Sequence, residues 1–305
     1  MTTALRGIVP PLCTPLDTDG SVDARSLERL VRRQLDDGVH GLFALGSSGE
    51  AVYLTDESRK QVLDIVVGAA AGAVPVLAGA VAASTARVIE QVRWISAFRV
   101  DAIVVTAPFY ANVSDAETIT HFEQVAAHSP FPVVAYDIPG NVGRKLPADV
   151  TIELFRRDVL MGLKDTSGET DEFLRVLREM GDRTGKAVMC GSDVGAADWL
   201  RAGADGIVPG IGNVAADLFT GLWDALRRGD EAEAARCQQD VTVVAAILGV
   251  GTRHGLGLHA SQLGALKHTL VRQGIFTTER VSPPLGSYPR EAAAEIDAIM
   301  ATIGR

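Results

Sequence analysis

The sequence contains 305 residues, of which 47% are hydrophobic and 5% aromatic, and its formal net charge at pH 7 is −9. We find no basic cluster of the kind that replaces phosphate counterions, which argues against nucleic-acid binding. Three cysteines without C-x-x-C spacing predict no disulfide framework and fit a reducing compartment. The first residues lack the apolar segment of a signal peptide, and the longest apolar run, 241–250, is too short to cross a bilayer. We therefore expect a cytoplasmic protein without a membrane segment.

Short apolar runs alternate with longer amphipathic segments over most of the chain. The runs occupy residues 7–11, 41–45, 74–78, 102–106, 132–136, 160–164, 187–190 and 206–209. Helical spacing follows at residues 26–35, 56–71, 84–98 and 114–128, with Thr55 as a predicted N-cap. Strands that are apolar on both faces, each followed by a helix, are typical of a parallel sheet covered by helices. Eight repeats predict an α/β fold of the (β/α)₈ TIM-barrel type over residues 1–225.

Residues 226–305 show only helical periodicity, and we interpret them as a C-terminal helical extension. A doubly wound open sheet is the competing fold. It would require a glycine-rich phosphate loop after the first strand, but residues 10–15 are rich in proline instead. The barrel is therefore the preferred interpretation.

Barrel enzymes build their sites at the carboxyl ends of the strands, where Lys164 and Tyr136 end two neighbouring apolar runs. A buried lysine that loses its proton can attack a ketone and form an imine, and a nearby phenol can transfer protons. The alternative for Lys164 is an ion pair with Asp165 or another carboxylate. The turn at residues 46–50 offers two hydroxyls and several N–H groups, which can bind a carboxylate, although it can also be a simple connection. The six histidines show no ligand spacing, so we predict no metal.

These segments together resemble the dihydrodipicolinate synthase and N-acetylneuraminate lyase superfamily of class I, pyruvate-dependent aldolases. The resemblance rests on five motifs in order along nearly the whole chain. They are Gly-Ser-Ser-Gly-Glu at 46–50, Pro-Phe-Tyr at 108–110, Tyr-Asp-Ile-Pro at 136–139, Gly-Leu-Lys-Asp-Thr-Ser-Gly at 162–168 and Gly-Ser-Asp at 191–193.

The resemblance implies a role for each matching residue. Lys164 would form the Schiff base with pyruvate or another 2-oxo acid, and no other cofactor would be needed. Tyr136 would transfer protons, Ser47 would relay them, and Tyr110 would complete the relay across a subunit interface. The implied assembly is a homo-oligomer, a dimer of dimers. The substrate-binding residues implied by the resemblance, or by their place beside its motifs, are Gly46, Ser48, Asn141, Thr166, Asp193 and Val208.

Two departures from the family pattern narrow the expected substrate. Asn141 occupies the position where dihydrodipicolinate synthases carry an arginine for the carboxylate of the aldehyde partner, and Arg144 lies three residues away, out of register. Val194 stands where sialic acid lyases have an acidic residue. We therefore expect an aldolase that cleaves or forms a 2-keto-3-deoxy sugar acid or a hydroxy-2-oxo acid, with pyruvate as the common product and an aldehyde as the partner.

Several alternatives remain open from the sequence. One is 4-hydroxy-tetrahydrodipicolinate synthase itself. Another is an imine-dependent dehydratase, such as 5-dehydro-4-deoxyglucarate dehydratase, or a hydratase-aldolase. A third is a 2-oxo-acid-binding barrel without activity, which we regard as the weakest.

Overall fold

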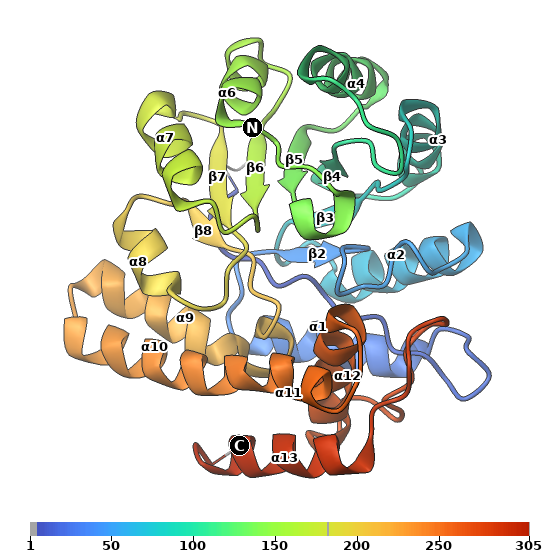
Figure 1. The fold of residues 1–305 in the computed structure, drawn as a ribbon, viewed down its shortest axis with the longest axis vertical. Helices are drawn as coiled ribbons and strands as arrows, with labels where there is room; N and C mark the ends of the chain where they lie inside the picture. Colours follow the sequence, from blue (N-terminus) through green and yellow to red (C-terminus); the bar gives the residue numbers. More distant parts are fainter. Residues whose placement is uncertain (1–4, 182, 305) are drawn as a thin grey trace.

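The computed structural model describes residues 5–181 and 183–304, and within them eight parallel strands form one sheet (Figure 1). Each strand is short and buried along its whole length, as apolar runs covered on both faces require. The strands are β1 (Gly7–Ile8), β2 (Leu42–Ala44), β3 (Val76–Gly79), β4 (Ala102–Thr106), β5 (Val133–Asp137), β6 (Gly162–Asp165), β7 (Ala187–Cys190) and β8 (Gly206–Ile207).

The sheet closes on itself into a TIM barrel. Strands β2 to β8 pair in sequence order, and β8 also pairs with β1. The last gap, between β1 and β2, is bridged just beyond β1, where Pro11 pairs with Phe43 and the N–H of Leu12 donates to the Phe43 carbonyl at 2.8 Å. The first and last strands are shorter than the apolar runs predict. In each of these two runs a proline, Pro10 or Pro209, stands two residues after the last strand residue, and proline has no N–H with which to extend the ladder.

Helices alternate with the strands and continue beyond the barrel. They are α1 (Ala24–Asp36), α2 (Asp56–Ala70), α3 (Thr85–Ile95), α4 (Asp115–His128), α5 (Pro139–Val142), α6 (Ala148–Arg156), α7 (Thr170–Met180), α8 (Ala196–Arg201), α9 (Gly212–Arg228), α10 (Glu231–Ala245), η1 (Ala246–Gly249), α11 (Val250–Arg253), α12 (Leu258–Arg272) and α13 (Arg290–Ala301). The extension from α10 onward lies in orange and red in the lower part of Figure 1. None of the described helices is long and apolar enough to cross a membrane.

Local sequence signals explain where two of these helices begin. The Thr55 side chain accepts from the N–H of Ser58 and caps α2, as the sequence predicts. Ser114 and Glu117 form a reciprocal capping box that starts α4. Helix α1 begins two residues before the predicted segment because Asp23 caps it.

Strand alternation divides the core into two layers. Inward-facing residues such as Val134 and Tyr136 fill the barrel, whereas their neighbours Val133 and Ala135 pack against the helices. The same alternation decides which side chains at the strand ends face the barrel mouth.

Candidate active site

Lys164 and Tyr136 lie side by side at the barrel mouth. They are register partners on β6 and β5, and both side chains are buried. The Lys164 Nζ lies 4.0 Å from the centroid of the Tyr136 ring and 5.0 Å from that of Phe43. Among the described residues, no carboxylate lies within ion-pair distance of this amine. The alternative of an ion pair with Asp165 is therefore wrong, because Asp165 points to the opposite face of the sheet and pairs with Lys145.

The turn at residues 46–50 brings hydroxyl groups to this amine. Ser47 Oγ lies 3.4 Å from the Tyr136 hydroxyl, so the two groups share a hydrogen bond. Ser48 lines the same cavity. Gly46 is required here, because a Cβ at this position would lie 2.7 Å from the Phe43 ring.

The conformation of this turn is held by a buried ion pair that we did not predict. Glu50 has a left-handed backbone (φ 57°), and its carboxylate pairs with Lys267 of α12, with both side chains fully buried. Its other oxygen accepts the N–H of Ser282 at 2.6 Å, while Lys267 donates to the Arg280 carbonyl at 2.6 Å. The signal available in the sequence was a lysine on the apolar face of a helix, four residues after Leu263.

A cavity of about 120 Å³ surrounds the Lys164 amine. A second cavity of about 170 Å³ adjoins it and shares Ser47, Tyr136, Ile138, Asn141 and His259 with it. Helix α12 supplies part of the first wall, which the sequence analysis missed. The residues lining the first cavity are Pro11, Ser47, Ser48, Tyr136, Ile138, Asn141, Lys164, Thr166, Gly191, Asp193, Val208, Gly210, Leu248, His259, Gln262, Leu263 and Leu266.

Asp193 is a carboxylate that lines the same cavity as the Lys164 amine. Burial raises the pKa of Asp193 to about 7, although the N–H groups of Ile211 and Gly210 and the charge of Lys164 oppose that shift. An aspartate with such a pKa exchanges protons near neutral pH and can hydrogen-bond a substrate hydroxyl in either form. Thr166 packs beside it against Gly191, where a Cβ would meet the Thr166 hydroxyl at 2.1 Å.

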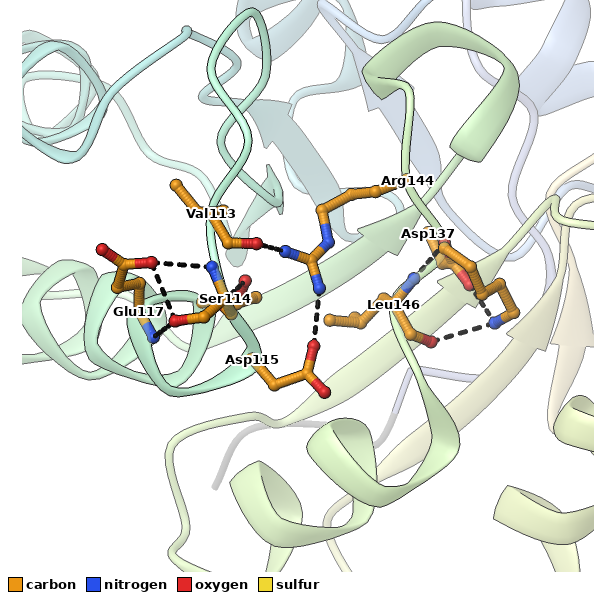
Figure 2. Close-up of polar contacts among 9 residues, drawn as sticks. Val113, Ser114, Asp115, Glu117, Asp137, Arg144 and Leu146 are labelled. Carbon is orange, nitrogen blue, oxygen red and sulfur yellow. Dashed lines mark hydrogen bonds and ion pairs between the residues drawn. The ribbon is translucent and has the colours of Figure 1, made fainter.

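The mouth of the cavity carries an amide instead of a guanidinium. Asn141, on the short helix α5, lines both cavities. Arg144 turns away and bonds the Val113 carbonyl and the Asp115 carboxylate at the start of α4, the latter at 2.6 Å (Figure 2). Among the described residues that line the two cavities, Lys164 is therefore the only lysine or arginine.

Tyr110 is the predicted site residue that this chain does not bring to the cavity. Its side chain is fully exposed, its φ is 76°, and it lines neither cavity. A bulky residue with an exposed ring and a positive φ is an uncommon combination in a folded chain.

A metal centre has no candidate in the described part of the chain. No three His, Cys, Asp or Glu side chains converge there in a way that would hold an ion.

Comparison with known proteins agrees with this geometry. Residues 4–302 match the dihydrodipicolinate synthetase family. An uncharacterised DapA-like lyase of Halobacterium salinarum is 34% identical over 87% of this chain and 88% of its own length. The 4-hydroxy-tetrahydrodipicolinate synthase of Stenotrophomonas maltophilia is 36% identical over 69% of this chain and 70% of its own.

Solved structures give the same result. YagE, a prophage protein of E. coli K12 crystallised with pyruvate, superposes with a TM-score of 0.90 at 28% identity, and 99% of each chain is covered. The dihydrodipicolinate synthase of Bacteroides thetaiotaomicron also gives a TM-score of 0.90, at 27% identity, with 99% of this chain and 100% of that chain covered. The chain belongs to the dihydrodipicolinate synthetase family of pyruvate-dependent class I lyases.

Proposed function

We propose that this enzyme cleaves 2-keto-3-deoxy acids through a Schiff base on Lys164, releasing pyruvate and an aldehyde. The observation that carries the proposal is a buried amine with no carboxylate partner, in register with a tyrosine whose hydroxyl contacts a serine. The cavity beside Lys164 gives a small substrate access to this amine, and the neutral form of a lysine is the nucleophile that attacks a carbonyl carbon.

The first half of the reaction uses Lys164 and the turn at residues 46–50. The amine attacks the C2 carbonyl, and loss of water from the carbinolamine leaves an imine. The substrate carboxylate is held by the Ser48 hydroxyl and by the free N–H groups of the turn. The N–H groups of Ser48 and Gly49 donate no hydrogen bond to another backbone carbonyl of the described residues.

The second half uses Tyr136 and Ser47. Tyr136, having given its own proton to the hydroxyl that leaves the carbinolamine as water, takes the proton of the C4 hydroxyl. The C3–C4 bond breaks, and its electron pair moves into the protonated imine to give an enamine. The aldehyde leaves, C3 is protonated, and water hydrolyses the imine to release pyruvate and free Lys164. Thr166, Asp193 and the backbone at Val208 would orient the substrate hydroxyls.

The substrate preference follows from the mouth of the cavity. An anionic aldehyde is best held by a bidentate arginine, and here Asn141 offers only an amide while Arg144 is bound elsewhere. This argues against 4-hydroxy-tetrahydrodipicolinate synthase, the activity named for several relatives. A dehydratase would use the same imine, and analysis of the reaction products distinguishes it from an aldolase.

The assembly is proposed as a dimer of dimers. The exposed Tyr110 ring of one protomer would enter the site of its neighbour and extend the relay from Tyr136 and Ser47. A fully exposed tyrosine at positive φ supports this arrangement.

Borohydride trapping with pyruvate tests the central step. We expect a reduced adduct on the peptide that contains Lys164, and none in Lys164→Ala. A screen of 2-keto-3-deoxy acids then distinguishes pyruvate plus aldehyde from a dehydrated acid. A folded wild-type protein that forms no adduct with excess pyruvate would refute the Schiff-base proposal.

A further inference from the structure

Two buried carboxylates lie directly behind the proposed catalytic pair. Asp137 follows Tyr136 on β5, and Asp165 follows Lys164 on β6, so strand alternation turns both away from the cavity. Their exposed fractions are only 1% and 5%. Two adjacent buried anions are costly unless a cation balances them.

Lys145 supplies that cation. Its Nζ bonds Asp137, lies 3.3 Å from Asp165 Oδ2 and donates to the Leu146 carbonyl at 3.0 Å. No other lysine, arginine or histidine of the described chain pairs with either carboxylate. The Leu146 N–H donates to the second Asp137 oxygen at 3.0 Å, a contact that Figure 2 shows.

The two carboxylates favour the charged form of Lys145. Burial alone would lower the pKa of Lys145, but the two carboxylates outweigh it and raise that pKa. Burial raises the pKa of Asp137, and the Lys145 hydrogen bond opposes that shift. When all three are ionised, the group carries one net negative charge, and without Lys145 it would carry two.

The titratable groups around Lys164 fall into two sets. Tyr136, Asp193 and His259 face it from the cavity side, and the Lys145 group lies behind it on the helix side. Additional negative charge behind the amine favours the ammonium form, which cannot attack a carbonyl.

We propose that Lys145 is a positioning residue that keeps the Lys164 amine reactive at neutral pH by balancing Asp137 and Asp165. The proposal rests on the Schiff-base function above. It adds the requirement that the charges of Asp137 and Asp165 be balanced on the helix-facing side of the sheet, away from the substrate cavity.

The test measures the initial rate of borohydride trapping with pyruvate against pH. In Lys145→Met we expect the midpoint of the acid limb to move to higher pH, because one additional negative charge behind the amine favours its ammonium form. Lys145→Arg should keep the wild-type midpoint, because it retains the charge. The double variant Asp137→Asn/Lys145→Met should recover it, because the net charge returns to the wild-type value.

Lys186→Met is the matched control. Lys186 has the same side-chain exposure, 23%, and bonds Asp158 and the Phe155 carbonyl, each at 2.6 Å. It precedes β7 and so lies at the opposite end of the barrel. This variant should leave the midpoint unchanged.

Labelling with acetic anhydride separates this inference from the proposed function, because it needs no substrate. The pH dependence of Lys164 acetylation, read by peptide mass spectrometry, should shift upward in Lys145→Met by the same amount as the trapping midpoint. Equal labelling midpoints in wild type and Lys145→Met would overturn the role of Lys145. A labelling shift in a protein that traps no pyruvate would support the role of Lys145 and refute only the Schiff base.

Discussion

The buried pair of Glu50 and Lys267 gives the sharpest prediction about stability. Replacing Lys267 by methionine keeps the side-chain volume but leaves the Glu50 carboxyl group without its cationic partner, at a site where both side chains are fully buried. Removing one partner of a buried pair costs about 3–5 kcal/mol. With about 2.1 cal/mol/K of unfolding entropy per residue, 305 residues convert that loss to about 5–8 °C in Tm.

Thermal unfolding at one fixed protein concentration measures this loss. The double variant Glu50→Gln/Lys267→Met should show a smaller fall in Tm than Lys267→Met, because it contains no buried carboxylate without a partner. The pair of the partly exposed Lys186 with the exposed Asp158 provides the control, and the free energy of unfolding should fall by less than about 1 kcal/mol in Lys186→Met. The KM for pyruvate should also rise in Lys267→Met, since the turn carrying Ser47 and Ser48 loses its anchor. A Tm within about 1 °C of wild type would refute the assignment of a charged pair to this site.

The remaining predictions concern an interface, a histidine and a thiol. Tyr110→Phe should slow turnover by about 10²–10⁴-fold without unfolding the protein. Mixed with the inactive Lys164→Ala, it should regain activity in hybrid dimers, and wild-type rates for Tyr110→Phe alone would exclude the shared relay. Burial lowers the pKa of His121 from 6.5 to about 4, so the unfolded state binds more protons between these values. The free energy of unfolding should therefore fall by about 3 kcal/mol as pH drops from 6.5 to 4. His121→Asn should flatten this dependence, and an unchanged slope in chemical denaturation would contradict it. Burial raises the pKa of Cys13 to about 12, so at pH 8 only about 10⁻⁴ of this thiol is ionised. It should react with dithiobis(nitrobenzoate) only after denaturation, and rapid labelling of the native protein would count against its burial.

The barrel and the central pair of the site were predictable because they depend on local patterns. Short apolar runs identify parallel strands, and consecutive strands in a barrel are neighbours, so Tyr136 and Lys164 had to lie close together. The lengths of β1 and β8 were less predictable, because apolarity marks burial and does not mark where the ladder of hydrogen bonds ends.

Long-range partners could not be predicted from the sequence. Helical periodicity shows that α12 has a buried face, but it does not show which strand ends that face covers. The contact of Lys267 with Glu50 and the place of His259 in both cavities therefore came only from the structure. Arg144 is a similar case, because its direction is decided by a carbonyl and a carboxylate some 30 residues earlier.

The two sides of the cavity come from different parts of the chain, because helix α12 covers, as a roof, a floor that the barrel strands form. The floor, with Lys164 and Tyr136, belongs to the barrel strands, whereas His259 and Gln262 reach the cavity from the C-terminal extension. Substitutions in the roof can change which molecules enter without altering the groups on the floor. The imine chemistry and the choice of substrate can thus diverge independently along one chain, and a graft of barrel loops alone would transfer only part of a relative's specificity.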